Sequence, residues 1–304
     1  MEKIYDMIVV GGGPGGYTAA LYGARAGLDV LLIERLSAGG QMNLTGQIDN
    51  YPGFPEGIDG FQLSMNMQQQ AERFGAKTRY AEVLHVDLKN QIKIVETNEG
   101  IYHSRTVVLS TGANPRQLGV ARENEMIGRG VGYCAHCDGM FYRGKTVVVV
   151  GGGNSAVAEA LYLSRIAKEV ILVHRRDSLR ATQIYHKPLL EASNIRFVWN
   201  AEVVDLLGEE VLSGVRVQNR ISGDEEILEA QGLFVSIGRK PATELVKEQL
   251  TLDEAGYIMA EENTQTGIAG VYAVGDVRAK ELRQIVTAVA DGAMAAHLAE
   301  QYLA

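Results

Sequence analysis

The segment from residue 8 to residue 16 reads Ile8-Val9-Val10-Gly11-Gly12-Gly13-Pro14-Gly15-Gly16, and 140 residues later the chain reads Val148-Val149-Val150-Gly151-Gly152-Gly153-Asn154-Ser155-Ala156. In both copies the apolar run predicts a buried strand, the glycines predict a tight turn, and the stretch that follows predicts a helix. A second apolar run follows in each copy, at 30–33 and 170–173. The chain therefore contains two copies of one strand, turn, helix and strand unit.

The glycines of such a unit have mechanical roles. The first permits a tight turn, the second lets the backbone approach a pyrophosphate, and the third lets the helix pack on the strand, a role that Ala156 can fill. The diphosphate of a dinucleotide is expected at the helix N-terminus, where free N–H groups favour an anion. The predicted contacts are Gly11, Gly13, Pro14, Gly15 and Gly16 in the first copy, and Gly151, Gly153, Asn154, Ser155 and Ala156 in the second.

The two copies differ at the end of their second strand, where the choice of dinucleotide is made. The first copy ends in Glu34, whose carboxylate suits the unphosphorylated ribose of FAD or NAD and repels the extra phosphate of NADP. The second copy has His174-Arg175-Arg176 at this place, with Arg180 one helical turn later if a helix follows. Three guanidinium groups around one position predict a site for the 2'-phosphate of NADPH.

Length and composition set the remaining limits. At 304 residues, with 46% hydrophobic residues, the chain is expected to form two globular domains. A formal net charge of -8 disfavours nucleic acid as a partner. The acidic start is unlike a secretory signal, and no apolar stretch reaches the ~18 residues that span a bilayer. We therefore expect a soluble, cytoplasmic protein with no nucleic-acid or membrane partner.

The only two cysteines, Cys134 and Cys137, are two residues apart, just before the second glycine-rich turn. A cytosolic chain seldom keeps a purely structural disulfide, so this spacing favours a metal-binding or redox-active pair. Zinc within one chain lacks ligands, because no other cysteine exists and no two histidines have zinc-finger spacing. Zinc bridging two subunits and an inert buried pair stay open as alternatives.

We interpret the pair as redox-active and expect no metal. A dithiol that attacks disulfides needs a lowered thiol pKa and a nearby group that manages the proton. Asp138 is the candidate acid/base because it follows Cys137 directly. His136 lies between the thiols, and it either stabilises a thiolate when protonated or points to solvent.

Two further motifs are similar to elements of flavoprotein disulfide reductases: Leu109-Ser110-Thr111-Gly112-Ala113, and a strand from Gly270 that ends in the Gly275-Asp276 turn. Taken together, the motifs resemble those of the low-molecular-weight, bacterial-type thioredoxin reductases over essentially the whole chain. The remaining residues that carry this resemblance are Gly11–Gly16, Gly39-Gly40-Gln41, Asn50-Tyr51-Pro52-Gly53, Cys134–Gly139, Gly151–Ala156, His174-Arg175-Arg176 with Arg180, and Arg283-Gln284-Ile285.

The resemblance implies an α/β fold of two Rossmann-like FAD/NAD(P)-binding domains, the second inserted into the first. The FAD-binding domain would comprise residues 1–115 and 243–304, and the NADPH-binding domain, which carries the cysteine pair, residues 116–242. The two crossings would lie near Asn114-Pro115 and 238–241, where proline and glycine suit connectors. The FAD contacts implied outside the glycine-rich turn are Glu34, Gln41, Asn50, Ala113, Asp276, Arg283, Gln284 and Ile285.

The resemblance also implies an activity. Electrons would pass from NADPH through FAD to the Cys134–Cys137 disulfide and on to the disulfide of thioredoxin, in a homodimer whose inserted domain rotates between two orientations. The chain departs from the family at His136, where a small or β-branched residue is usual, and at Met140-Phe141, where two aromatic residues usually help to receive thioredoxin. Arg129 matches a family position at that docking surface.

Rival functions predict different features. A reductase for a peroxiredoxin-like partner usually carries an extra N-terminal dithiol domain, and a ferredoxin- or flavodoxin-linked NADP reductase lacks the cysteine pair. A ferredoxin-driven thioredoxin reductase and a dithiol oxidase both lack the arginine cluster. A non-catalytic nucleotide sensor would keep the fold but would show no loss of flavin colour with NADPH. The cysteines and the arginines of this chain favour the NADPH-dependent reductase.

Overall fold

The computed structural model describes residues 3–44 and 47–304, so Met1 and Glu2, which begin the acidic start of the chain, lie outside the described residues. The chain forms two compact units. Unit 1 consists of Met1–Gly46, Tyr51–Asn114 and Lys240–Ala304, and unit 2 consists of Gln47–Asn50 and Pro115–Arg239.

The two crossings between the units are strands. They are β7 (Ala113–Pro115) and β16 (Arg239–Pro241), which pair as a two-stranded sheet. The ladder is continued by a hydrogen bond from the Arg116 N–H to the Gly238 carbonyl oxygen at 2.9 Å. The connectors expected from proline and glycine are therefore hydrogen-bonded to each other rather than irregular.

Unit 1 is built on a seven-stranded sheet in the order β3-β2-β1-β6-β5-β4, with β17 paired to β6. Strands β1, β2, β3, β6 and β17 run parallel, whereas β4 and β5 form an antiparallel extension. The strand bounds are β1 (Ile4–Val10), β2 (Val30–Glu34), β3 (Lys77–Tyr80), β4 (Val83–Asp87), β5 (Lys93–Thr97), β6 (Gly100–Leu109) and β17 (Val271–Ala273).

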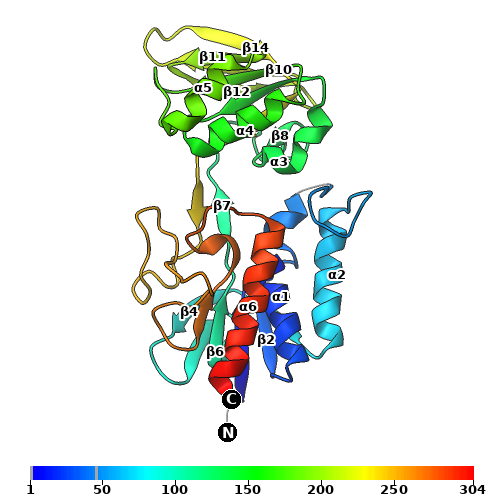
Figure 1. Ribbon diagram of the computed structural model, residues 1–304, viewed down its shortest axis with the longest axis vertical. Helices are drawn as coiled ribbons and strands as arrows, with labels where there is room; N and C mark the ends of the chain where they lie inside the picture. The colour runs from blue at the N-terminus through cyan, green and yellow to red at the C-terminus, as the bar shows by residue number, and fades with distance from the viewer. Residues whose placement is uncertain (1–2, 45–46) are drawn as a thin grey trace. The chain divides into compact units, whose positions relative to one another are not determined.

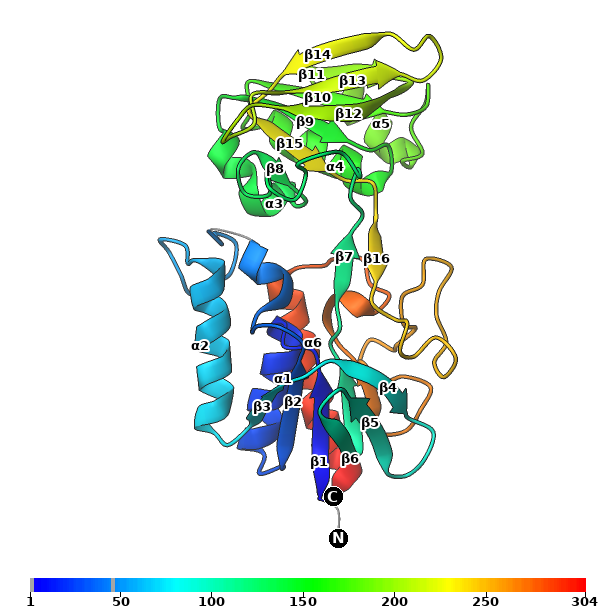
Figure 2. The same ribbon diagram turned by 180° about the vertical axis from the view of Figure 1, so that it is seen from behind.

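Three long helices cover one face of this sheet, as the views from the two sides show (Figures 1 and 2). They are α1 (Pro14–Arg25), α2 (Gly60–Arg73) and α6 (Ile285–Leu303), accompanied by the short helices η1 (Gly40–Leu44) and η4 (Gly275–Val277). Alternate residues of β1 supply the cores on the two faces. Met7 and Val9 pack with α1 and α6, whereas Ile8 and Val10 pack on the opposite side.

Unit 2 combines a parallel sheet in the order β11-β10-β9-β15-β8 with an antiparallel sheet in the order β12-β13-β14. The parallel strands are β8 (Val131–Gly132), β9 (Thr146–Val150), β10 (Glu169–His174), β11 (Ile195–Trp199) and β15 (Gly232–Val235). The antiparallel strands are β12 (Ala201–Leu207), β13 (Gly214–Asn219) and β14 (Glu225–Glu229). The helices are α3 (Ala135–Asp138), η2 (Gly139–Tyr142), α4 (Asn154–Ser164), η3 (Gln183–Tyr185) and α5 (His186–Glu191).

The parallel sheet of unit 2 lies between its helices and its antiparallel sheet, as Figures 1 and 2 show. Val147 and Val149 of β9 pack against α4, whereas Val148 and Val150 pack against the strands of the antiparallel sheet. The two predicted units of strand, turn, helix and strand are thereby confirmed as β1-α1-β2 and β9-α4-β10.

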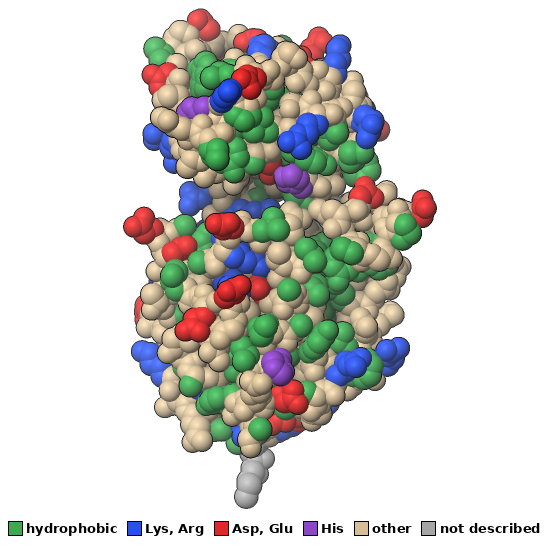
Figure 3. Space-filling view, in the orientation of Figure 1, with side chains coloured by type: hydrophobic (Ala, Val, Ile, Leu, Met, Phe, Trp, Pro, Cys, Tyr) green, Lys and Arg blue, Asp and Glu red, His purple; other side chains and the backbone are tan. Residues whose placement is uncertain are grey.

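The surface carries mixed charge. In the space-filling view, Lys and Arg side chains lie among Asp and Glu side chains on the face shown (Figure 3). Within residues 3–44 and 47–304, no helix is both long enough and apolar enough to cross a membrane.

Candidate functional site

The first glycine-rich turn joins β1 to α1. Gly11 has a φ of 102°, and a Cβ there would collide with the Ser110 carbonyl oxygen. A Cβ on Gly16 would collide with the Gly11 carbonyl oxygen, so the third glycine lets α1 approach the turn. At Gly13, by contrast, a Cβ would meet no atom within 4 Å, so the backbone here is open to a close-packed ligand.

The N-terminus of α1 offers donors to an anion. Gly13 is the N-cap residue in an extended conformation, and no side chain caps the helix. The first backbone N–H groups of a helix have no partner within the helix, and their dipole attracts negative charge. These features fit the pyrophosphate of a dinucleotide.

Glu34, the last residue of β2, is fixed against this turn. Its Oε2 accepts the Gly12 N–H at 2.7 Å, and its Oε1 accepts the Leu36 N–H at 3.1 Å. Each carboxylate oxygen keeps further acceptor capacity. The side chain can therefore accept ribose hydroxyl groups beside the pyrophosphate position, as an unphosphorylated adenosine requires.

The second turn, between β9 and α4, repeats the backbone geometry of the first. The Gly151 N–H donates to Val173 at 3.0 Å, as the Gly11 N–H donates to Ile33 at 2.9 Å. A Cβ on Gly151 would collide with the Ser236 carbonyl oxygen, and a Cβ on Gly153 would again meet nothing within 4 Å. Gly153 is the N-cap residue of α4, also without a side-chain cap. The second turn is therefore equally suited to a diphosphate.

His174 lies where Glu34 lies in the first copy. Its ring packs on Gly152, at which a Cβ would collide with it, and the side chain is buried. Burial lowers the pKa of His174, and the nearby charges of Arg180, Arg176 and Arg175 lower it further. A neutral imidazole therefore occupies the position at which Glu34 places a negative charge.

The three arginines are exposed at the end of β10. No helix follows Arg176, because residues 175–178 form bends, so the condition under which Arg180 would lie one helical turn later is not met. Arg180 nevertheless returns to the turn, since its N–H donates to the Gly152 carbonyl oxygen at 2.7 Å. The equivalent bond in the first copy runs from Gly39 to Gly12 at the same distance. The backbone therefore brings Arg180 to the glycine-rich turn without a helix.

The other residues expected to contact FAD come from several segments of the chain. Gln41 lies in η1, and its Nε2 donates to Oδ1 of Asn114 at 3.0 Å. Asn114 follows the buried Ala113 in β7. Asp276 lies in η4, at the C-terminal end of β17. Asn50 belongs to the segment Gln47–Asn50, which is grouped with unit 2.

Arg283, Gln284 and Ile285, the remaining expected FAD contacts, lie at the start of α6. The guanidinium of Arg283 lies 4.0 Å from the centroid of the Tyr257 ring. Gln284 is the N-cap residue of α6 and forms a capping box with Thr287, and Ile285 is the first residue of the helix. Parallel strands that end at one edge of a sheet are where α/β proteins bind ligands.

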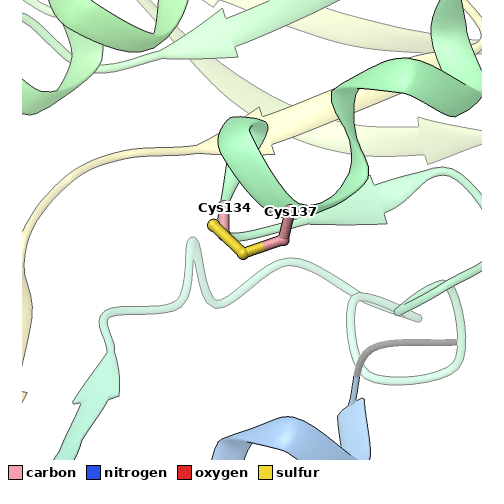
Figure 4. Close-up of a disulfide and its surroundings, with 2 residues drawn as sticks. All are labelled: Cys134 and Cys137. Carbon is pink, nitrogen blue, oxygen red and sulfur yellow. A yellow bond between two sulfur atoms is a disulfide. The ribbon is translucent and has the colours of Figure 1, made fainter. Parts of the chain in front are cut away.

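The cysteines form a disulfide at the first turn of α3 (Figure 4). Cys134 is the N-cap residue in an extended conformation, and its carbonyl oxygen accepts the N–H groups of Cys137 and Asp138, both at 3.1 Å. The Cα atoms of the cysteines are 5.3 Å apart. One turn of helix therefore holds both sulfur atoms, and the bond can open and close locally.

Asp138 is the last residue of α3, and its carboxyl group is largely buried. A Cβ on Gly132 of β8 would lie 3.2 Å from Oδ2 of Asp138. Burial raises the pKa of Asp138 to about 6. A carboxyl group with this pKa exchanges a proton near neutral pH, as an acid/base beside a dithiol must.

His136 packs on a neighbouring helix although it is exposed. Its ring centroid lies 4.3 Å from that of Tyr162 of α4. Burial against this neighbour lowers the pKa of His136, so the ring is neutral at pH 7. A cation beside the thiols is therefore not supplied by His136 at this pH.

A second acid beneath α3 was missed from the sequence. Glu159 lies on α4, and burial raises its pKa to about 7, against the opposing effects of Arg239, the Ser236 hydroxyl and the Ala135 N–H. The only sequence signal is one acid inside the otherwise apolar run 156–163.

Among the described side chains, no three His, Cys, Asp or Glu residues are grouped as metal ligands.

The family model of the pyridine nucleotide-disulphide oxidoreductases matches residues 5–292. The chain belongs to this family. Curated relatives match essentially the whole of this chain. Thioredoxin reductase of Listeria monocytogenes serovar 1/2a is 44% identical over 303 residues, which are 99% of this chain and 95% of that protein. The bifunctional thioredoxin reductase/thioredoxin of Mycobacterium leprae is 44% identical over 305 residues, or 100% of this chain and 67% of that protein.

A solved structure has the same fold as this chain over its whole length. The crystal structure of thioredoxin reductase from Streptococcus pyogenes matches with a TM-score of 0.93 and 41% identity, covering 100% of this chain and 99% of that chain. The resemblance to bacterial-type thioredoxin reductases and the α/β fold expected from the sequence are thereby confirmed.

Proposed function

We propose that this pyridine nucleotide-disulphide oxidoreductase is an NADPH-dependent, FAD-containing thioredoxin-disulfide reductase. The observation that carries the proposal is a disulfide on an acid-flanked helical turn, in the same unit as a dinucleotide turn with three adjacent arginines. The names of the full-length relatives support thioredoxin reductase activity. The bifunctional Mycobacterium leprae relative, whose name joins the reductase to thioredoxin, supports thioredoxin as the partner.

We assign FAD to unit 1. The open backbone at Gly13 and the uncapped N-terminus of α1 would hold its pyrophosphate, and Glu34 would accept its ribose hydroxyl groups. Asp276 would accept a ribityl hydroxyl, with Gln41, Asn50, Ala113, Arg283, Gln284 and Ile285 as the further contacts that the resemblance implies. When bound, FAD accepts a hydride from a reduced nicotinamide and passes two electrons to a disulfide.

We assign NADPH rather than NADH to unit 2. Arg175, Arg176 and Arg180 supply three cations at the place where Glu34 supplies an anion in unit 1. Guanidinium groups bind phosphate with charge-assisted hydrogen bonds, and the neutral His174 does not repel it. The 2'-phosphate of NADPH is the ligand group that this arrangement fits.

The residues around the disulfide account for the acceptor half of the reaction. Two electrons and two protons convert the Cys134–Cys137 disulfide into two thiols, and Asp138 can take up or release a proton at neutral pH. A thiolate of the pair then attacks the thioredoxin disulfide and forms a mixed disulfide. The second thiol displaces thioredoxin as a dithiol, which carries away the two electrons and two protons and restores the Cys134–Cys137 bond.

We also place the protein in the cytoplasm as a homodimer, as the resemblance implies. A reversible pair with no other cysteine in the chain suits a compartment in which thiols are kept reduced. Light scattering of the purified protein tests the dimer, and a monomer at micromolar concentration would contradict it.

Anaerobic stopped-flow mixing tests the proposed function. The purified protein should be yellow, NADPH should bleach its flavin absorbance faster than NADH does, and thioredoxin disulfide should then restore the colour. Equal rates with NADH and NADPH would contradict the role of the arginines. A colourless protein that binds no added FAD would contradict the assignment of unit 1.

A further inference from the structure

A buried cluster of charged side chains lies behind the Gly275-Asp276 turn of unit 1. Its centre is Asp291 of α6, whose Oδ1 accepts NH1 of Arg278 at 2.9 Å and whose Oδ2 accepts Nζ of Lys280 at 2.8 Å. The three side chains are only 9 to 12% exposed. NH2 of Arg278 donates to the Glu261 carbonyl oxygen at 3.1 Å. The two cations thus contact one carboxylate directly, and all three side chains are largely shielded from solvent.

The same carboxylate holds the backbone of the turn. Oδ2 of Asp291 also accepts the Gly275 N–H at 2.9 Å. Gly275 has a φ of 72°, a conformation in which glycine is far less strained than other residues, so the turn has one defined geometry here. The next residue is Asp276, the proposed partner of the ribityl chain. A hydrogen bond from a backbone N–H to a buried carboxylate is stronger than one to a neutral acceptor.

Gly292, the residue after Asp291, lets α6 lie close against the first glycine-rich turn. A Cβ on Gly292 would collide with the Gly15 carbonyl oxygen and would lie 2.9 Å from the Ala19 nitrogen. The contact is close from the other side too, because a Cβ on Gly15 would lie 3.1 Å from the Ala288 carbonyl oxygen. At these two glycines the backbone of α6 therefore lies close against the backbone of α1.

We propose that Asp291 and Gly292 are positioning residues for the flavin. Asp291 holds the turn that contains Asp276, and Gly292 lets the same helix lie against the pyrophosphate turn. One stretch of α6 thereby sets the distance between two FAD-binding segments that are 260 residues apart in the chain, at Gly15 and Gly275. This inference rests on the proposed assignment of FAD to unit 1.

The test is FAD affinity, measured by titrating FAD into apoprotein and following flavin fluorescence. Replacing Asp291 alone would leave two buried cations unpaired, so the informative comparison is the double variant D291N/K280M against K280M. The double variant keeps the net charge of the native cluster but lacks its carboxylate. Exchange of the charged acceptor of the Gly275 N–H for a neutral amide oxygen predicts that FAD binds roughly tenfold more weakly to the double variant than to K280M.

Two further measurements separate positioning from general stability. E300Q changes an exposed carboxylate of the same helix and should bind FAD like the wild type. The two thiols of unit 2, counted with a disulfide reagent after reduction by dithiothreitol, should react alike in all variants. G292A should weaken FAD binding because its added methyl group would displace α6 from Gly15.

The outcomes distinguish this inference from the proposed function. If the wild type binds no FAD, the proposed function fails. If the wild type binds FAD and D291N/K280M binds it within twofold of K280M, the positioning role of Asp291 is overturned. The positioning role would also be overturned if the double variant lost FAD affinity together with a lower melting temperature of the apoprotein and an altered reactivity of the thiols of unit 2.

Discussion

Replacing Asp138 by asparagine should stabilise unit 2 at neutral pH while it removes a proton-exchanging group. Burial raises the pKa of Asp138 from 3.8 to about 6, so the folded protein binds this proton more tightly than the unfolded chain does. A raised carboxyl pKa gives stability that is present below the unfolded pKa and is lost as the pH rises through the folded pKa. A shift of about two units corresponds to about 3 kcal/mol, lost between roughly pH 4 and pH 7.

The assay uses the only tryptophan of the chain. Trp199 ends β11 in unit 2, and its ring lies 4.9 Å from that of Phe197, so its fluorescence reports the unfolding of this unit. Urea unfolding of the oxidised protein should show D138N more stable than the wild type by about 3 kcal/mol at pH 8, with the difference nearly gone at pH 4.

The control is Asp224, an exposed residue in the turn between β13 and β14 of the same unit. D224N should follow the wild type at every pH. The reasoning would be refuted if D138N and the wild type had parallel stability profiles from pH 4 to pH 8, because the buried carboxyl group would then carry no linked proton.

Three further predictions concern other parts of the molecule. E159Q should stabilise unit 2 at pH 8 by about 3 kcal/mol, because burial raises the pKa of Glu159 to about 7, and the effect should vanish below pH 4.5 in the same urea assay. The variant R175A/R176A/R180A should have a KM for NADPH at least a hundredfold higher than the wild type, because each lost charge-assisted contact costs roughly 1 kcal/mol or more. Its KM for NADH should stay within threefold of the wild-type value, and an equal rise for both cofactors would contradict a role toward the 2'-phosphate. G16A should be isolated without bound FAD because its methyl group would collide with Gly11. G267A, at an exposed position of unit 1 where an added Cβ would meet no atom within 4 Å, should keep FAD, and flavin content per protein decides this.

The local parts of the fold and of the site could be predicted from the sequence. The strand, turn and helix around Gly11 and around Gly151 are each continuous in the sequence, so the glycine spacing predicts them. The close approach of Ser110 and Ser236 to the two turns comes from distant strands and could not be predicted in this way. The position of Glu34 and His174 follows from the same unit, since β2 and β10 each lie beside the strand that precedes the turn. The arginine cluster could be located for this reason, although bends and not a helix follow it.

The remaining features depend on packing between distant segments. Burial raises the pKa of Glu159 against the opposing effects of Arg239, Ser236 and the Ala135 N–H, and nothing in its own helix indicates these neighbours. The Asp291 cluster joins α6 to the segment after β17, and the pairing of β7 with β16 joins the two crossings. Hydrophobic period and glycine spacing describe neighbours along the chain, whereas these contacts arise only when the sheets have formed.

Electrons should reach thioredoxin only through the Cys134–Cys137 pair. The most direct measurement is thioredoxin reduction by C134S and C137S, each loaded with FAD and mixed with NADPH. Both variants should still lose their flavin colour on adding NADPH but should reduce no thioredoxin disulfide. Turnover of thioredoxin at the wild-type rate by either variant would contradict it.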